Sequence, residues 1–237
     1  LVLISAALAW GLRSKWFSIQ SIVVTGDVQH NNVATLRANV VPRLAGTFFS
    51  MDLASSRQVF ESVPWVRKAV VKRDFPNRLR VVLQEHQAVA YWGSESESRL
   101  INSQGEVFEA NLGEVEQDVL PRLDGPEGQA RAVLAAYRQF KPLFANLDLE
   151  LDQLELSGRG SWQAHLDNGA TLHLGRGSTD EVAGRTQRFL KTLTQVASTY
   201  GRRPEAIESA DLRHDSGYAI RLRGVTTVAP AHAKQDK

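Results

Sequence analysis

Two histidines of one predicted hairpin, His165 and His173, could do chemistry, because a pair of imidazoles can hold a metal ion. Asn168-Gly169 between them favours a two-residue turn, since both turn residues need positive φ. Such a turn pairs Ala164 with His173, and successive residues of a strand point to opposite faces. We therefore expect the two imidazoles on opposite faces, and we predict no metal site and no cofactor.

The stretch "DLRHDSG" gathers Asp, His and Ser, the residue types of a nucleophilic triad, within a few positions that include His214 and Ser216. A triad usually takes its members from separate loops, which hold them in a chain of hydrogen bonds. Asp215, Ser216 and Gly217 are also common turn formers. We interpret this stretch as a turn. No carboxylate pair stands out for acid–base work, so no active site is predicted.

Two stretches could bind anions. "LGRGS", from Leu174 to Ser178, places glycines and an arginine before a helix N-terminus, but it lacks the lysine and the length of a P-loop. A basic run from Arg67 to Arg80 raises a nucleic-acid hypothesis, yet strand alternation divides it between two faces and no aromatic platform is interleaved. A strand-to-helix turn and a solvated strand face are the preferred interpretations, and no nucleic-acid partner is predicted.

The composition is that of a folded protein with one large domain or two small ones. The chain has 237 residues, a net charge of +2, 43% hydrophobic residues and a sequence pI of about 9.0. The basic excess is too weak to imply nucleic acid by itself. Because the sequence contains no cysteine, disulfides, zinc–thiolate sites and cysteine nucleophiles are excluded.

An apolar run, "LVLISAALAWGL", opens the sequence and covers Leu1–Leu12. It is shorter than the ~20 residues of a membrane span. It could be the outer part of a transmembrane helix, a signal-peptide core with a small-x-small site at Ala7-Leu8-Ala9, or a buried helix. The Arg13, Lys15 and Trp16 that follow are typical of a membrane interface.

The elements that would position these residues fall into two sets. Residues 17–86 predict a β-α-α-β-β order that ends in a hairpin of strands 66–73 and 78–85. Residues 87–223 predict mostly antiparallel strands with two helices. Ser178 and Glu181 form a capping box at the start of the second helix, and Gly201 suits its C-terminal cap. Residues 224–237 read as a disordered tail.

Several of these stretches together resemble the FtsQ/DivIB family of cell-division proteins. "FSIQSIVVTG" and "SVPWVRKAVVKRDFPNRLRVVLQEHQAVAYW" resemble a POTRA domain leading into the second domain of that family. "LPRLDGPEG", "GSWQAHLDNGATLHLGRG" and "ADLRHDSGYAIRL" follow in the family's order, so the likeness covers Phe17 to about Leu222. It implies an α+β fold: the outer part of a membrane helix and a juxtamembrane stretch (1–16), a POTRA domain (17–86) and a β domain (87–223).

The resemblance also implies a function. Family members are non-enzymatic divisome scaffolds of the cell inner membrane, single-pass type II, with most of the chain periplasmic and placed at the septum. FtsB, in complex with FtsL, is implied to add a strand to the last strand of the β domain, while FtsK and FtsW are implied partners of the POTRA and membrane region. No small-molecule substrate is implied.

The resemblance assigns this partner contact to particular residues. The family's Arg-Tyr-Asp-Ser-Gly hairpin corresponds to residues 213–217, where His214 replaces the aromatic, so Tyr218 is a candidate substitute. A second family arginine matches Arg159. Both arginines are implied to meet partner carboxylates, which the planar guanidinium fork binds in a bidentate way. The predicted site comprises Arg159, Arg213, His214, Ser216, Gly217, Tyr218, Ala219, Ile220, Arg221 and Leu222.

Two other classes of protein compete with this interpretation. A POTRA-bearing envelope assembly or transport factor would need a large membrane barrel, whereas the ~150 residues after the POTRA-like unit contain two amphipathic helices. A cell-wall enzyme would need a nucleophile or metal constellation, and none is recognised. The sequence therefore favours a scaffold that is not an enzyme.

Overall fold

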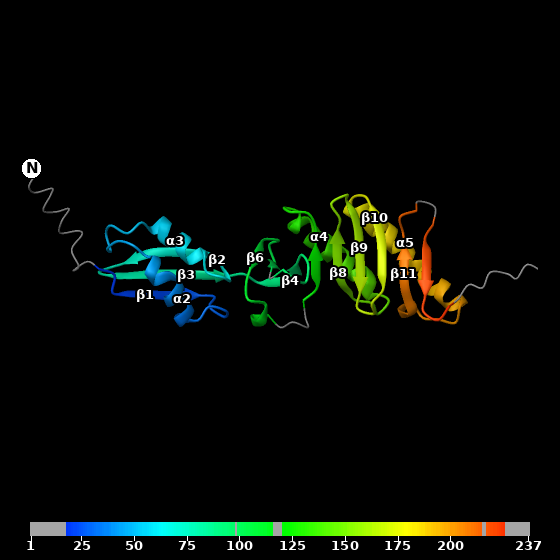
Figure 1. Ribbon diagram of the computed structural model, residues 1–237, viewed down its shortest axis with the longest axis horizontal. Helices are drawn as coiled ribbons and strands as arrows, with labels where there is room; N and C mark the ends of the chain where they lie inside the picture. Colours follow the sequence, from blue (N-terminus) through cyan, green and yellow to red (C-terminus); the bar gives the residue numbers. More distant parts are fainter. Residues whose placement is uncertain (1–17, 98, 116–119, 215–216, 226–237) are drawn as a thin grey trace, which may run out of the picture. The chain divides into compact units, whose positions relative to one another are not determined.

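The structure is a computed structural model that describes residues 18–97, 99–115, 120–214 and 217–225. The chain forms two compact units, with boundaries after Val89, Glu97 and Leu120. Residues 90–97 and those after Leu120 belong to the second unit, and the remainder to the first. Figure 1 labels most of the helices and strands of both units.

The first unit contains the expected β-α-α-β-β order. Its elements are β1 (Ser21–Gly26), α2 (Val33–Val40), the short 3₁₀ helix η2 (Val41–Arg43), α3 (Leu53–Glu61), β2 (Val66–Asp74) and β3 (Arg78–Glu85). The sheet order is β1-β3-β2, with β1 parallel and β2 antiparallel to the central strand β3. The side chains of Asn32 and Asp52 accept hydrogen bonds from the first turns of α2 and α3, which fixes where these helices begin.

One face of this small sheet is buried beneath the two helices. Strand β3 alternates strictly between exposed and buried residues, so Leu79, Val81 and Leu83 point to the core. They join residues of α2, α3 and β2 in a single apolar cluster. On the opposite face Lys68, Lys72 and Arg80 are exposed, as the preferred interpretation of the basic run requires. The run also contains two arginines that are engaged elsewhere: Arg73 lies on the covered face, opposite Leu79, and donates to the loop before α3, and Arg67 is ion-paired with Glu106.

A later hairpin also belongs to the first unit. It consists of β5 (Arg99–Asn102) and β6 (Val107–Glu109), followed by the 3₁₀ helix η3 (Leu112–Glu114). A turn that contains Gln104 and Gly105 connects its strands, with Gly105 at φ 81°. This hairpin, although it follows the POTRA-like segment in sequence, is part of the same compact body.

The second unit is a sheet covered by two helices. Its strands follow the spatial order β12-β11-β10-β9-β8-β7-β4. The bounds are β4 (Ala88–Trp92), β7 (Arg122–Asp124), α4 (Ala130–Ala145), β8 (Leu151–Leu156), β9 (Ser161–Leu166), β10 (Thr171–Arg176), α5 (Thr179–Thr199), η4 (Pro204–Ala206), β11 (Ile207–Asp211) and β12 (Ala219–Leu222).

This sheet is more mixed than the sequence suggested, although the α+β class is confirmed. β7 and β8 are parallel neighbours joined through α4, and β10 and β11 are parallel neighbours joined through α5. A parallel pair needs such a crossover, so each helix creates one parallel pair. β4 also runs parallel to β7, whereas the pairs β8–β9, β9–β10 and β11–β12 are antiparallel.

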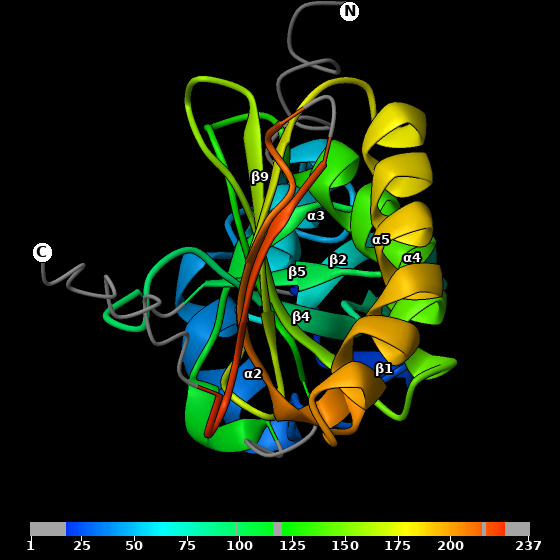
Figure 2. The ribbon, with the colours of Figure 1, turned by 90° about the vertical axis from the view of Figure 1, so that its right-hand side faces the viewer.

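Helices α4 and α5 cover the same face of the larger sheet, as Figure 2 shows. The core between these helices and the sheet contains Phe140 and Phe144 from α4 and Phe189 from α5, all almost fully buried. Phe140 packs edge-on against Trp162 of β9 at 5.8 Å between ring centres. The predicted capping box of Ser178 and Glu181 begins α5, and Gly201 follows the helix at φ 62°, so both helix-end predictions are confirmed.

Candidate partner-binding site

Strand β12 is the terminal strand of the larger sheet. It pairs on one side with β11, and no described strand lies on its other side. Ala219 and Arg221 are exposed, Ile220 is half-buried and Leu222 is buried, so the strand turns one row of side chains to the core. Its outer backbone groups are therefore available to a further strand.

The residues around this strand differ in how far their side chains are already engaged. The Tyr218 hydroxyl lies 2.6 Å from Thr192 Oγ1 of α5, and its ring meets Phe189 edge-on at 4.8 Å. Arg221 forms an exposed ion pair with Glu208 at 3.2 Å. His214 and Gly217 are exposed, while Ser216 and the neighbouring Asp215 lie outside the described residues. Tyr218 thus packs against the domain's own helix.

Four arginines line a pocket at the end of the sheet from which the β11–β12 connection leaves. Arg159 comes from the β8–β9 turn, Arg176 from the end of β10, Arg185 from α5 and Arg213 from just beyond β11. The pocket has a volume of about 440 Å³ and is completed by Ser157, Ser161 and Gly175. We call it the arginine pocket. It brings together Arg159 and Arg213, which the family resemblance singled out separately.

Arg213 is oriented by a carboxylate of its own chain. Its Nε and Nη2 donate to the two carboxylate oxygens of Asp211, at 2.9 and 2.6 Å. These hydrogen bonds hold the pKa of Asp211 well below its usual range. A guanidinium carries five N–H donors, so Asp211 leaves others for a second carboxylate.

Arg185 reaches the pocket from α5 and is also fixed in place. Its guanidinium donates to the backbone oxygens of Leu174 and Arg176, at 2.6 and 3.2 Å. Gly175 permits this approach, because it has φ 84° and a Cβ there would lie 2.9 Å from Arg185 Nη1. No local pattern in the sequence indicates Arg185, because its role depends on the contact between α5 and β10. Arg176 belongs to the "LGRGS" stretch, whose capping box occupies the helix N-terminus.

The expected orientation of the two histidines is wrong. His165 pairs with Thr171 and His173 with Gln163, so both imidazoles lie on the same, half-exposed face of the hairpin. The reason is that Leu166 donates to the oxygen of Ala170, which makes the loop three residues long instead of two. The two histidines nevertheless do not belong to a metal site. Within the part of the chain that the structure describes, no group of three or more ligating side chains could hold a metal ion.

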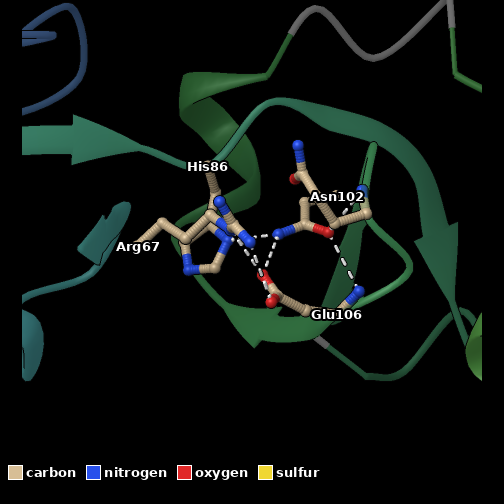
Figure 3. A network of polar contacts seen from close by, with 5 residues as sticks. Arg67, His86, Asn102 and Glu106 are labelled. Atoms are coloured by element: carbon tan, nitrogen blue, oxygen red, sulfur yellow. Dashed lines mark hydrogen bonds and ion pairs between the residues drawn. The ribbon is translucent and has the colours of Figure 1, made fainter.

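The first unit contains a polar network that attaches the β5–β6 hairpin to β2 (Figure 3). Arg67 of β2 donates through Nε and Nη2 to the carboxylate of Glu106, at 2.6 and 3.0 Å. The fully buried Asn102 accepts at Oδ1 from the backbone N–H groups of Gln104 and Glu106. Its Nδ2 group therefore faces Glu106 at 2.7 Å and His86 Nδ1 at 2.8 Å.

The geometry of this network requires a neutral His86. Because Asn102 presents an amide N–H to His86 Nδ1, this ring nitrogen must accept a hydrogen bond. Burial lowers the pKa of His86 below its ordinary 6.5, which favours the same state. The ring stacks on Phe108 of β6 at 4.1 Å, and Phe108 meets Trp65 edge-on at 5.3 Å. Polar and aromatic contacts thus fasten the hairpin to the first unit.

We predict that Glu106→Gln makes the stability of the protein less sensitive to acid. Hydrogen bonds from Arg67, then from Asn102, lower the pKa of Glu106 from 4.5 to about 2. Since the folded-state pKa is the lower one, this carboxylate stabilises the fold above pH 4.5, and its contribution is lost as the pH falls toward 2. Urea unfolding at pH 6, 4.5 and 3 should show a smaller loss for Glu106→Gln than for the wild type.

The matched control is Glu109→Gln, an exposed carboxylate on the same hairpin. It should keep the wild-type dependence on pH. Equal pH dependence of the wild type and Glu106→Gln would contradict the assignment of the acid sensitivity to this network.

The predicted membrane anchor lies outside the residues that the structure describes. In the described ranges, none of the helices has the length and apolar content to cross a bilayer. The apolar run Leu1–Leu12 lies in residues 1–17, which are not described. The predicted disordered tail likewise falls mostly outside the described residues.

Comparisons with known proteins identify both parts of the chain. Residues 17–86 match the family model "POTRA domain, FtsQ-type", and residues 90–213 match "Cell division protein FtsQ/DivIB, C-terminal". The chain is 40% identical to the cell division protein FtsQ of Burkholderia pseudomallei over 226 residues, covering 95% of this chain and 88% of that protein. FtsQ of Thiomonas arsenitoxydans is 37% identical, covering 91% and 79%. FtsQ of Escherichia coli is 30% identical, covering 90% and 76%. The chain therefore belongs to the FtsQ/DivIB family of cell division proteins.

Proposed function

We propose that this chain is a non-enzymatic scaffold of the division machinery that binds FtsB, in its complex with FtsL, at the β12 edge and the arginine pocket. One observation carries the proposal. β12 is an edge strand with no described strand on its outer side, and the connection that precedes it contributes Arg213 to a pocket lined by four arginines. A strand added to β12 would supply backbone hydrogen bonds, and acidic side chains entering the pocket would set its register.

The wider role follows from the family. We propose that Leu1–Leu12 is part of a single membrane anchor of type II in the cell inner membrane, with both compact units in the periplasm at the septum. FtsK and FtsW are the proposed partners of the POTRA domain and membrane region. No cofactor, nucleic acid or small-molecule substrate has a part in this role.

Membrane fractionation combined with affinity capture tests the proposed function. The full chain, tagged and produced in a Gram-negative host, should sediment with the inner membrane and retain FtsB and FtsL after detergent extraction. A tagged inner-membrane protein of unrelated function provides the background. Recovery with the outer membrane and its assembly factors would instead support the alternative of a POTRA-bearing assembly protein.

A further inference from the structure

One end of the first unit carries aromatic side chains that the fold does not bury. Phe75, in the turn between β2 and β3, is 74% exposed, and Phe49, in the loop before α3, is 44% exposed. The buried Phe48 contacts both rings edge-on, at 6.2 Å from Phe75 and 5.1 Å from Phe49. Large exposed apolar side chains that gather in one place are typical of an interaction surface.

The aromatic cluster is held in position by Arg73 of β2. Its Nε donates to the backbone oxygen of Phe48 at 2.6 Å, and its Nη2 donates to the oxygens of Phe49 and Met51. These bonds fasten the loop of residues 48–51 to the strand that leads into the turn. The exposed rings are therefore presented by a preformed scaffold.

Cations flank the turn that carries Phe75. Lys72, Arg78 and Arg80 are exposed, and the strand register places them within a few residues of the turn, since Asp74 pairs with Arg78 and Lys72 with Arg80. Asp74 is shared by Arg78 and Arg80, at 3.3 and 3.4 Å. The other nearby acid, Asp52, caps α3. This end of the unit thus has a net positive charge.

The same end lies where the N-terminal segment joins the domain. β1 runs parallel to β3 and begins opposite Arg78, and the N–H of Gln20 donates to the oxygen of Asn77 in the turn at 2.9 Å. The eight residues from Arg13 to Gln20 span at most about 28 Å when fully extended. If Leu1–Leu12 is inserted in a bilayer, the turn is confined to the region just above that membrane.

We propose that this end of the POTRA domain, with Phe49, Phe75, Lys72, Arg78 and Arg80, rests on the anionic phospholipid headgroups of the membrane that holds the anchor. The inference rests on the proposed anchoring and goes beyond it. Aromatic rings suit the boundary between headgroups and acyl chains, and each cation near an anionic surface raises the ratio of bound to unbound domain about fivefold. The contact orients the domain on the membrane.

A fluorescent label tests the contact. Because the chain contains no cysteine, Phe75→Cys provides a single site for an environment-sensitive dye in the full chain reconstituted into vesicles. With phosphatidylglycerol present, the emission should shift to the blue and be quenched by lipids that carry a spin label near the headgroup. Pure phosphatidylcholine should give much less of both.

Two controls make the result specific. Val33→Cys labels an 80% exposed valine at the start of α2, at the end of the unit where Glu85 binds the backbone of His30 and Asn31, and should show neither change. Arg78→Gln combined with Arg80→Gln in the Phe75→Cys chain should reduce the ratio of membrane-bound to unbound domain about 25-fold. Thermal melting checks that this variant remains folded.

The outcomes separate the two proposals. If the chain is washed from vesicles by alkaline carbonate, the anchor itself is wrong. If the chain remains but the label at position 75 behaves like that at position 33, the headgroup contact is wrong. A shift that appears only when division proteins are added would also overturn the lipid contact, because it would identify this end as a protein-binding surface.

Discussion

Replacing Arg213 with glutamate should weaken binding of the FtsB periplasmic segment at least about 30-fold, equivalent to about 2 kcal/mol or more, while the domain remains folded. Arg213 is the member of the arginine pocket nearest to the β12 edge in sequence, and its side chain is 59% exposed. The change removes the donors proposed to meet a partner carboxylate and adds repulsion against it. Isothermal titration of the segment into the full chain measures the effect.

Asp211 makes the choice of variants important. In Arg213→Glu a second carboxylate would face Asp211, which now receives two hydrogen bonds from the guanidinium. Local repulsion could therefore disturb the hairpin without any role in binding. Arg213→Ala avoids this repulsion and should still weaken binding, although less. Melting of both variants at the temperature of the wild type would show that their binding defects do not arise from unfolding.

Lys191→Glu provides the charge-matched control. Lys191 is exposed on α5 and does not line the arginine pocket. Its reversal changes the net charge by the same amount, so any general loss of electrostatic attraction will be shared by both variants. If Arg213→Glu and Lys191→Glu bind the segment equally well, Arg213 has no specific part in the interface.

Local signals explain most of what could be predicted from the sequence. The capping box at Ser178 and Glu181 satisfies backbone donors within one helical turn, so it is visible in four residues. The β2–β3 hairpin is equally local, because alternation and its turn residues define it. The order of the first unit follows from such signals, as does the position of β12 at the end of the chain.

The features that were predicted wrongly or missed depend on contacts between residues distant in the sequence. The hairpin loop after β9 has three residues; Asn168 Nδ2 donates to the oxygen of Glu205, and Arg223 donates to the oxygen of Asn168. Neither contact can be read from the hairpin itself, and the difference of one residue brought both histidines to one face. Likewise, Arg185 reaches the arginine pocket only because α5 packs beside the end of β10.

Proline at position 220 should remove FtsB binding while preserving the domain. The N–H of Arg223 points to the β11 side, because it donates to the oxygen of Ala206. The register shift of this strand pair lies on β11, between Ile207 and Ser209, so the alternation along β12 is not interrupted. Inward and outward N–H groups alternate along a strand, so those of Ala219 and Arg221 point to β11 and that of Ile220 points outward. Ile220→Pro therefore removes a donor from the outer edge only.

The neighbouring positions should respond in the opposite way. Ala219→Pro and Arg221→Pro remove donors to β11, which should destabilise the second unit by about 1–3 kcal/mol and lower its melting temperature by several degrees. Ile220→Pro should melt close to the control Ile220→Ala, which loses the same half-buried side chain but keeps the N–H. Differential scanning calorimetry separates these two patterns.

Binding then tests strand addition itself. Ile220→Ala keeps the outward donor and should retain most of its affinity for FtsB, whereas Ile220→Pro should bind at least about tenfold more weakly. The two variants differ mainly in one backbone N–H and in the freedom of φ, so a difference in affinity at equal melting temperature comes from the edge. If Ile220→Pro melts like Ile220→Ala and binds FtsB as tightly, the partner does not add a strand to β12, and the arginine pocket must act without it.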